Sequence, residues 1–441
     1  MSAVVPLTRM LARPSRQGRA AIVLPIVAFA VTTALLLVVV GGARMFLVDA
    51  RATENGMYGT LAVLALLLLA VPLATLGAAA ARLSSRRRND RLATLRLLGA
   101  STREIWALTV IEATATAAAG ALAGIVIYAA ALPAVGMLPF FGGPVGVGAV
   151  AADPLLTAAV VAGVVVVAAV SAAAGLRRVT ITPLGVRTRS AAPPKRRWLL
   201  VTGGILIAVV AIAVANVGLV GDVFGPAMVT TALLVLFAGG LALLNVVGAP
   251  IMAARGRAMA RSARTAARLI AGRELAAHAG PAWRRVSGMA LVSFIAVVAG
   301  CGLAIAGVSG DGPTLLLDIR TGVLVTLAIA FVLLACAVGV TQASAALEDR
   351  ELIVGLDRLG IPDAELRRAR RLTVMVPLRW AAVGGAAVGA VLSFPIVGLS
   401  LVVAPLSVAT VAATFVAGFA LVAGALASTR PIVTGIRRGT L

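Results

Sequence analysis

The sequence has very few of the side chains on which enzyme chemistry depends. It contains one histidine (His278), two cysteines and one lysine (Lys195) among 441 residues. This inventory provides neither a hydrolase triad nor a Cys/His metal cluster. A P-loop needs a lysine after its last glycine, but Lys195 follows Pro193-Pro194 and precedes arginine. We therefore expect no catalytic site, ATPase site, metal site or cofactor in this chain.

Charged residues are also scarce. They make up 12% of the chain, against about 25% in soluble domains, whereas 61% of residues are hydrophobic. Ten apolar stretches are long enough to cross a bilayer, and no segment between them reaches 50 residues. The sequence thus predicts an all-α polytopic membrane protein without a separate globular domain. The predicted spans are 21–42, 57–82, 104–132, 153–176, 198–219, 227–249, 287–308, 320–342, 372–394 and 402–427.

Acidic residues are outnumbered, and the net charge is +23. The excess is confined to alternate loops: six arginines in 83–103, six in 177–197 and eight in 250–286. The intervening loops are short and carry few charges; they are 43–56, 133–152, 220–226 and 309–319. This alternation follows the positive-inside rule, so it predicts a multi-pass plasma-membrane protein with both termini in the cytoplasm. Anionic lipid headgroups account for such basic loops without nucleic acid.

The most informative stretch runs from Arg86 to Gly124. A charged run is followed by an apolar ladder whose residues fall on one helical face. Gly99 is placed to end that short helix in a left-handed conformation. Ser101 or Thr102 can cap the next helix, with Glu104 near its positive N-terminus. The pattern predicts a short basic helix across the cytoplasmic mouth of a membrane helix, where a soluble partner could push it.

This stretch resembles the signature of FtsX-like permeases, the MacB-type membrane subunits of ABC transporters. The segment Arg91–Ala100 matches the family's charged run, Asp90 stands near its acidic position, and Glu112 matches its membrane glutamate. The resemblance implies a separate ABC ATPase that binds ATP and Mg²⁺ and docks on this loop. Many members carry a large external domain between their first two helices, whereas loop 43–56 is too short to hold one.

A second copy of the signature is found 261 residues later. This offset aligns Gly99 with Gly360, Leu98 with Leu359 and Asp90 with Glu351. Gly385-x-x-x-Gly389 similarly repeats Gly120-x-x-x-Gly124. We therefore predict two parallel four-helix FtsX-like repeats, 1–190 and 255–441, joined by a linker and two-helix insert at 191–254. One chain would then supply both halves of a pseudo-dimer and bind two ATPase copies.

The two copies differ in charge, because segment 348–371 balances six acids with six arginines. The residues that the resemblance assigns to ATPase coupling are Arg91, Arg96, Leu98, Gly99, Ala100, Arg103, Glu104, Glu351, Asp357, Leu359, Gly360, Asp363 and Glu365. Glu112 and Arg379 are charged residues inside predicted membrane helices. They either pair in the bundle interior or lie near the cytoplasmic interface, with Arg379 snorkelling.

The expected function is that of a permease subunit that couples ATP hydrolysis by its partner to export or extraction of a hydrophobic or amphiphilic substrate, such as a lipid, antimicrobial peptide or drug. Two alternatives stay open. One is a non-transporting permease that regulates a cell-wall hydrolase or a sensor kinase, and the other is an ion-driven secondary transporter. The use of arginine instead of lysine, with abundant alanine and valine, favours a bacterial source.

Overall fold

The structure is a computed structural model that describes residues 20–53, 56–86, 101–180, 205, 226–306, 313–348, 355, 360, 362–393 and 405–427. Within these residues the regular elements are helices, apart from one antiparallel pair of two-residue strands. It forms two compact units. The first comprises Met1–Arg189, Val332–Glu351 and Leu421–Leu441, and the second comprises Ser190–Phe331 and Leu352–Ala420.

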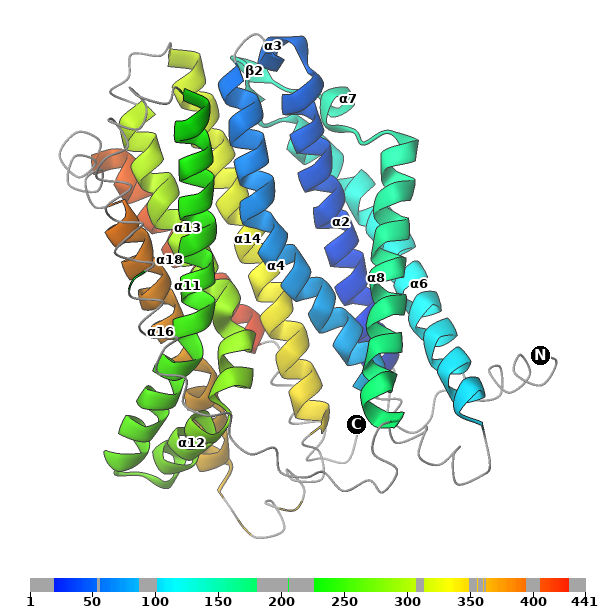
Figure 1. The fold of residues 1–441 in the computed structure, drawn as a ribbon, viewed down its shortest axis with the longest axis vertical. Helices are drawn as coiled ribbons and strands as arrows, with labels where there is room; N and C mark the ends of the chain where they lie inside the picture. Colours follow the sequence, from blue (N-terminus) through cyan, green and yellow to red (C-terminus); the bar gives the residue numbers. More distant parts are fainter. Residues whose placement is uncertain are drawn as a thin grey trace. The chain divides into compact units, whose positions relative to one another are not determined.

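The first unit is built around four long helices of the N-terminal half (Figure 1). These are α2 (Ala20–Val48), α4 (Gly56–Arg86), α6 (Thr102–Gly136) and α8 (Pro154–Thr180). Three small elements connect their ends: α3 (Ala50–Thr53), the hairpin of β1 (Pro139–Phe140) and β2 (Gly143–Pro144), and α7 (Val147–Val150).

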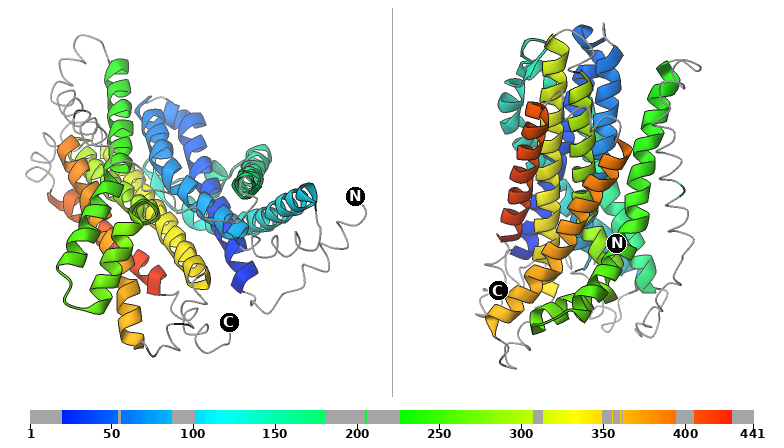
Figure 2. Two further views of the ribbon diagram at one scale, coloured as in Figure 1. Left: turned by 60° about the horizontal axis from the view of Figure 1, so that its bottom comes forward. Right: turned by 90° about the vertical axis from the view of Figure 1, so that its left-hand side faces the viewer.

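The second unit contains the helices of the C-terminal half. They are α11 (Pro226–Arg261), α12 (Ala266–Ala277), α13 (Ala279–Ala306), α14 (Pro313–Glu348), α16 (Asp363–Leu392) and α18 (Pro405–Ala427). The last parts of α14 and α18 belong to the first unit. Figure 2 shows α12 at the end of the second unit where α16 begins.

Six described helices are long and apolar enough to cross a membrane, and the chain is therefore a multi-pass membrane protein. The spans are Val23–Val48, Trp106–Gly136, Pro154–Ala173, Ala279–Gly300, Thr314–Ala343 and Arg367–Leu392. Each overlaps a span predicted from the sequence, although Ala279–Gly300 begins and ends eight residues before the predicted 287–308. Predicted spans 57–82, 227–249 and 402–427 lie within helices α4, α11 and α18, whereas span 198–219 lies outside the described residues apart from Ile205.

Several hydroxyl side chains inside these helices bond to their own backbone. Thr32 donates to the carbonyl oxygen of Ala28 at 2.7 Å, and Ser293 donates to that of Met289 at 2.8 Å. Thr341 donates to the carbonyl oxygen of Ala337 at 2.6 Å. Because hydrocarbon offers no hydrogen-bond partners, such bonds to the preceding turn allow polar residues to lie within a spanning helix.

In the first unit, two glycines let α2 and α6 approach closely. A Cβ atom at Gly120 would lie 2.5 Å from Cβ of Phe29 and 2.8 Å from the carbonyl oxygen of Ile26. A Cβ atom at Gly124 would lie 2.7 Å from the carbonyl oxygen of Ala30. Small residues at this spacing permit close packing of membrane helices. The glycine pair therefore fixes where α6 crosses α2.

The second unit uses the same device between α13 and α16. A Cβ atom at Gly385 would overlap the carbonyl group of Ala290, and one at Gly389 would lie 3.2 Å from the carbonyl oxygen of Phe294. Ala290 and Phe294 are fully buried. Both predicted Gly-x-x-x-Gly motifs thus lie at a helix crossing inside their own unit.

The segment 250–286, predicted as a basic loop, is helical. Helix α11 continues to Arg261, and α12 is capped at Thr265, whose hydroxyl accepts a hydrogen bond from the amide of Arg268. Backbone contact at Gly256 and Gly272 joins α11 to α12, because a Cβ atom at Gly272 would lie 2.7 Å from the amide nitrogen of Ala260. The prediction of a loop rested on the arginines of this segment and did not use the Thr265 cap or the two glycines.

Candidate functional site

The start of α6 is the part of the predicted coupling segment that the structure describes best. Ser101 precedes the helix, and its hydroxyl oxygen accepts a hydrogen bond from the amide of Glu104 at 3.3 Å. The Glu104 carboxylate accepts hydrogen bonds from the amide of Ser101 at 2.9 Å and from its hydroxyl at 2.8 Å. This reciprocal capping box satisfies backbone donors that the helix itself leaves free.

The capping box also affects the charge at this end. The hydrogen bond from the Ser101 amide, with that from its hydroxyl, lowers the pKa of Glu104. Glu104 is therefore ionised at neutral pH beside a positive helix end. Ser101, Arg103 and Glu104 are all exposed. The first turn of α6 is thus a fixed structure whose charged side chains are accessible to a partner.

Several residues assigned to coupling lie outside the described part of the chain, and their roles stay predictions. In the first copy these are Arg91, Arg96, Leu98, Gly99 and Ala100, and in the second they are Glu351, Asp357 and Leu359.

The second coupling segment begins its helix differently. Gly360 has φ 73°, the left-handed conformation that was predicted for its counterpart Gly99. Pro362 occupies the N-cap position of α16 without a side-chain capping bond, and Asp363 is the first helical residue. One carboxylate oxygen of Glu365 is buried without a hydrogen bond in the structure. The two helix starts therefore differ in charge and also in hydrogen bonding, because α6 has a side-chain cap and α16 has none.

Glu112 and Arg379 are both exposed within their own units. Glu112 lies in the α6 span and Arg379 in the α16 span. They belong to different compact units, and their pairing stays a prediction.

Asp318 was not singled out from the sequence. It was assigned to an external loop at 309–319, but α14 begins at Pro313 and the candidate span begins at Thr314. Asp318 is only 4% exposed. An acidic residue buried in a membrane helix is a candidate functional residue by default. The available signal was Pro313, since proline favours the first turn of a helix.

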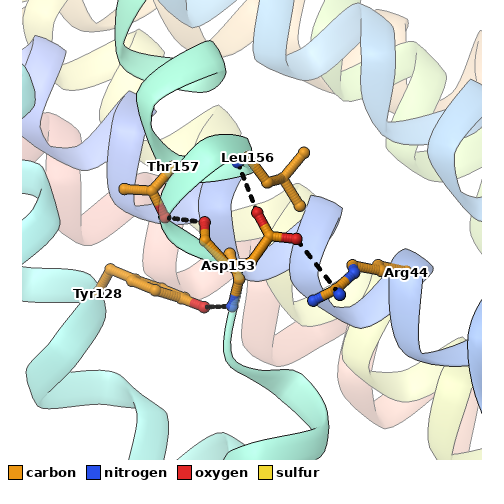
Figure 3. Close-up of polar contacts among 6 residues, drawn as sticks. Arg44, Tyr128, Asp153, Leu156 and Thr157 are labelled. Atoms are coloured by element: carbon orange, nitrogen blue, oxygen red, sulfur yellow. Dashed lines mark hydrogen bonds and ion pairs between the residues drawn. The ribbon is translucent and has the colours of Figure 1, made fainter.

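A network of polar contacts fixes the loop between α6 and α8 (Figure 3). The Tyr128 hydroxyl accepts a hydrogen bond from the amide of Ala152 at 2.8 Å and donates one to the carbonyl oxygen of Val150 at 3.3 Å. Asp153 accepts a hydrogen bond from the amide of Leu156 at 2.7 Å and forms an ion pair with Arg44 at 3.3 Å. The loop is thereby attached to both α6 and α2.

The adjoining hairpin is covered by an aromatic cluster. Phe46 contacts Tyr58, Phe140 and Phe141, with ring centroids 6.0, 5.2 and 5.9 Å away. The guanidinium of Arg51 lies 4.8 Å from the centre of the Phe141 ring. Phe141 has a positive φ of 56°, which non-glycine residues rarely adopt. These contacts hold it there. The positive-inside prediction assigns this end of the unit to the external face.

Arg51 also contacts Asp49, in the connection between α2 and α4. Its guanidinium donates hydrogen bonds to the Asp49 carboxylate at 3.1 and 2.8 Å. These bonds, together with the Arg51 amide, lower the pKa of Asp49. The short connection between α2 and α4 is therefore ordered by its own side chains.

Comparison with known proteins identifies one part of the chain. Residues 59–183 match the family model described as FtsX-like permease C-terminal. The match includes most of α4, the predicted coupling segment, α6 and α8. It confirms, over this region, the resemblance inferred from Arg91–Ala100. No curated protein and no solved structure matches the chain.

Proposed function

We propose that this chain, whose residues 59–183 form an FtsX-like permease domain, is the membrane subunit of an ABC transporter that works with a separate ATPase. The observation that carries the proposal is this match, because it includes the basic segment and the helix that follows it. Permeases of this kind act as membrane subunits of ABC-type systems, which agrees with the spanning helices.

The capped start of α6 supports the coupling step of the proposal. A partner that moves segment 86–104 would act on a helix whose first turn is fixed by Ser101 and Glu104. Helix α6 contacts the backbone of α2 at Gly120 and Gly124, so displacement at its start would be passed to α2. We infer that closure of the ATPases on ATP drives this displacement.

Two observations support the proposed pair of four-helix repeats. Each unit has a Gly-x-x-x-Gly motif against an earlier helix, at α2–α6 and at α13–α16. An offset of 265 residues relates Gly120 to Gly385 and also Phe29 to Phe294; Phe29 lies beside Gly120, whereas Phe294 lies beside Gly389. We propose boundaries of 1–190 and 255–441, with 191–254 as linker and insert, and both termini in the cytoplasm.

The proposed cargo is a hydrophobic or amphiphilic molecule, such as a lipid, antimicrobial peptide or drug, that is exported or extracted from the bilayer. The connections between α2 and α4 and between α6 and α8 support this class, because each is short and folded back on its own unit. Transfer of a substrate to a distant protein outside the membrane would need a larger external domain at these connections.

The alternatives remain testable in the same system. A regulatory permease would couple to its ATPase but move no substrate. An ion-driven transporter would work without any ATPase, and buried Asp318 is the residue that favours testing it.

The test is transport by the chain reconstituted with the ATPase co-purified from its source. We expect Gly99→Pro and Leu98→Asp to abolish substrate-stimulated ATP hydrolysis and transport while leaving membrane insertion intact, because a helix stop and an apolar contact are lost. Gly384→Ala, at a site with open space around the glycine, is the matched control. Full transport by either coupling variant with the ATPase bound would refute the proposal.

Stoichiometry is a second test. Each proposed repeat carries one Leu-Gly loop, Leu98-Gly99 and Leu359-Gly360, and the resemblance implies an ATPase dimer. One permease chain should therefore bind two ATPase chains in native mass spectrometry. A complex with two permeases and two ATPases would contradict this. So would a permease that binds no ATPase in any nucleotide state.

A further inference from the structure

The region from the end of α11 through α12 to the start of α13 carries a concentration of positive charge that the proposed function does not use. Eight arginines lie between Arg255 and Arg285, against Glu274 as the single acid. Seven of the eight are exposed, and none forms an ion pair within the described residues. Such a surface requires anionic groups nearby, from solvent or from a partner.

Helix α12 presents apolar side chains next to this charge. Its inner face consists of Ala267, Ala271, Gly272 and Leu275, all buried. On the opposite face Leu269 is 42% exposed and Ile270 is 54% exposed. Arg273 follows these two residues at helical spacings of four and three, so it lies on the same outward face.

The position of α12 holds this face close to a bilayer. Only His278 separates α12 from α13, whose candidate membrane span begins at Ala279. At its other end α12 is joined to α11 by the Gly256–Gly272 backbone contact. Helix α12 therefore cannot move far from the point at which α13 enters the membrane.

We propose that the outward face of α12 binds the anionic phospholipid headgroups of the cytoplasmic leaflet. Leu269 and Ile270 would be inserted below the phosphates, and Arg273, with exposed Arg264 just before the helix, would pair with the phosphates. Exposed aliphatic residues flanked by arginines are the composition of helices that lie in the membrane interface. The basic residues supply selectivity for anionic lipid over zwitterionic lipid. This inference does not depend on the proposed transport function.

The contact would also reach the second coupling segment. Helix α12 packs against α16, and Arg255 of α11 lies 3.9 Å from the centre of the Trp380 ring of α16. Lipid bound at α12 would thus stabilise the position of the helix that begins at Asp363.

The first experiment measures lipid selectivity in the full-length protein. Phosphatidylglycerol and phosphatidylcholine are titrated in detergent, and bound lipid is counted by native mass spectrometry. Arg264→Gln with Arg273→Gln should lower the preference for phosphatidylglycerol about tenfold, because each arginine near an anionic surface contributes to binding. The matched control, Arg368→Gln with Arg371→Gln, removes equal charge from exposed positions of α16. An equal loss in both variants would overturn the assignment to α12.

The second experiment measures depth. A bimane probe on Ile270→Cys, with Cys301 and Cys336 replaced by serine, is examined in vesicles of phosphatidylcholine and phosphatidylglycerol at a ratio of three to one. The proposal requires quenching by a lipid with a nitroxide near its headgroup, and weaker quenching in pure phosphatidylcholine. Quenching by aqueous iodide instead, or protection only when the ATPase is added, would overturn it and identify α12 as a protein-docking face.

Discussion

At the scale of the residue, two adjacent glycines of α16 differ in what surrounds them. A Cβ atom at Gly384 would meet no atom within 4 Å, whereas one at Gly385 would overlap the Ala290 carbonyl group. We expect Gly385→Ala to destabilise the protein by about 1–3 kcal/mol, the cost of overpacking. Gly384→Ala should be neutral or slightly stabilising, because alanine favours helix. Thermal midpoints in detergent would test this, and equal midpoints would disprove the proposed crossing.

Asp153 combines two interactions that substitution can separate. Its side chain accepts the Leu156 amide hydrogen bond at the start of α8 and pairs with Arg44. Asp153→Ala should cost about 1 kcal/mol, the usual loss for a helix cap. Asp153→Asn keeps an acceptor oxygen, and Arg44→Gln removes only a half-exposed ion pair, so each should cost less.

Hydrogen exchange of the segment that contains Leu156, together with the thermal midpoint, distinguishes these variants. Asp153→Ala should accelerate exchange there most strongly. If Arg44→Gln has the same effect as Asp153→Ala, the ion pair and not the cap fixes the start of α8.

At the scale of the element, the start of α6 depends on the ionised form of Glu104. Its pKa is lowered in the folded protein, so its contribution to stability is present above its ordinary pKa of 4.5 and is lost as pH falls through the lowered value. Exchange protection of the first turn of α6 should therefore decrease below pH 4.5. Ser101→Ala should remove that protection at neutral pH, whereas Ser101→Thr should keep it.

The measurement is hydrogen exchange of the peptide 101–110, corrected for the intrinsic effect of pH. Glu104→Gln is the control, because its helix start should no longer respond to acid. Protection that is unchanged in Ser101→Ala would show that tertiary contacts fix this turn without the cap.

The sequence was sufficient to predict the long helices, because a spanning segment needs an unbroken apolar stretch and little else. It also predicted a cap at Ser101 or Thr102, since capping side chains before an apolar run are a local pattern, and the structure shows that the cap is Ser101. The role of Glu104 required coordinates, because only they show its carboxylate bonded back to Ser101.

Other features depend on contacts between distant residues. The sequence Pro139–Pro144 predicts a loop, but the hairpin there is fixed by Phe46, Tyr58 and Arg51 from other segments. Helix α12 was missed because its alanines and arginines give a weak apolar pattern, and its stability comes from close backbone contact with α11. Tertiary packing, and not local propensity, decides such elements.

At the scale of the whole molecule, the charge distribution predicts the topology. Arginine-rich segment 250–286 should be cytoplasmic, and segment 309–313, which precedes the α14 span, should be external. Single cysteines in 309–313, the part of the predicted loop that precedes the α14 span, should react with a membrane-impermeant maleimide added to intact cells, in a chain without Cys301 and Cys336. Cysteines at exposed positions of α12 should react only after lysis. The reverse pattern would invert the assignment and remove the lipid proposal for α12.

The Tyr128 hydroxyl has a mechanical consequence for the first unit. It joins α6 to the main chain on both sides of Ala151, immediately before α8. At this end α6 is therefore hydrogen-bonded to the segment that leads into α8, and we expect the two helices to move together as a rigid body instead of hinging at the loop. A tilt imposed on the first turn of α6 would tilt α8 in the same direction. Tyr128→Phe would remove both hydrogen bonds of the hydroxyl, so α6 and α8 would move more independently while each helix stays intact.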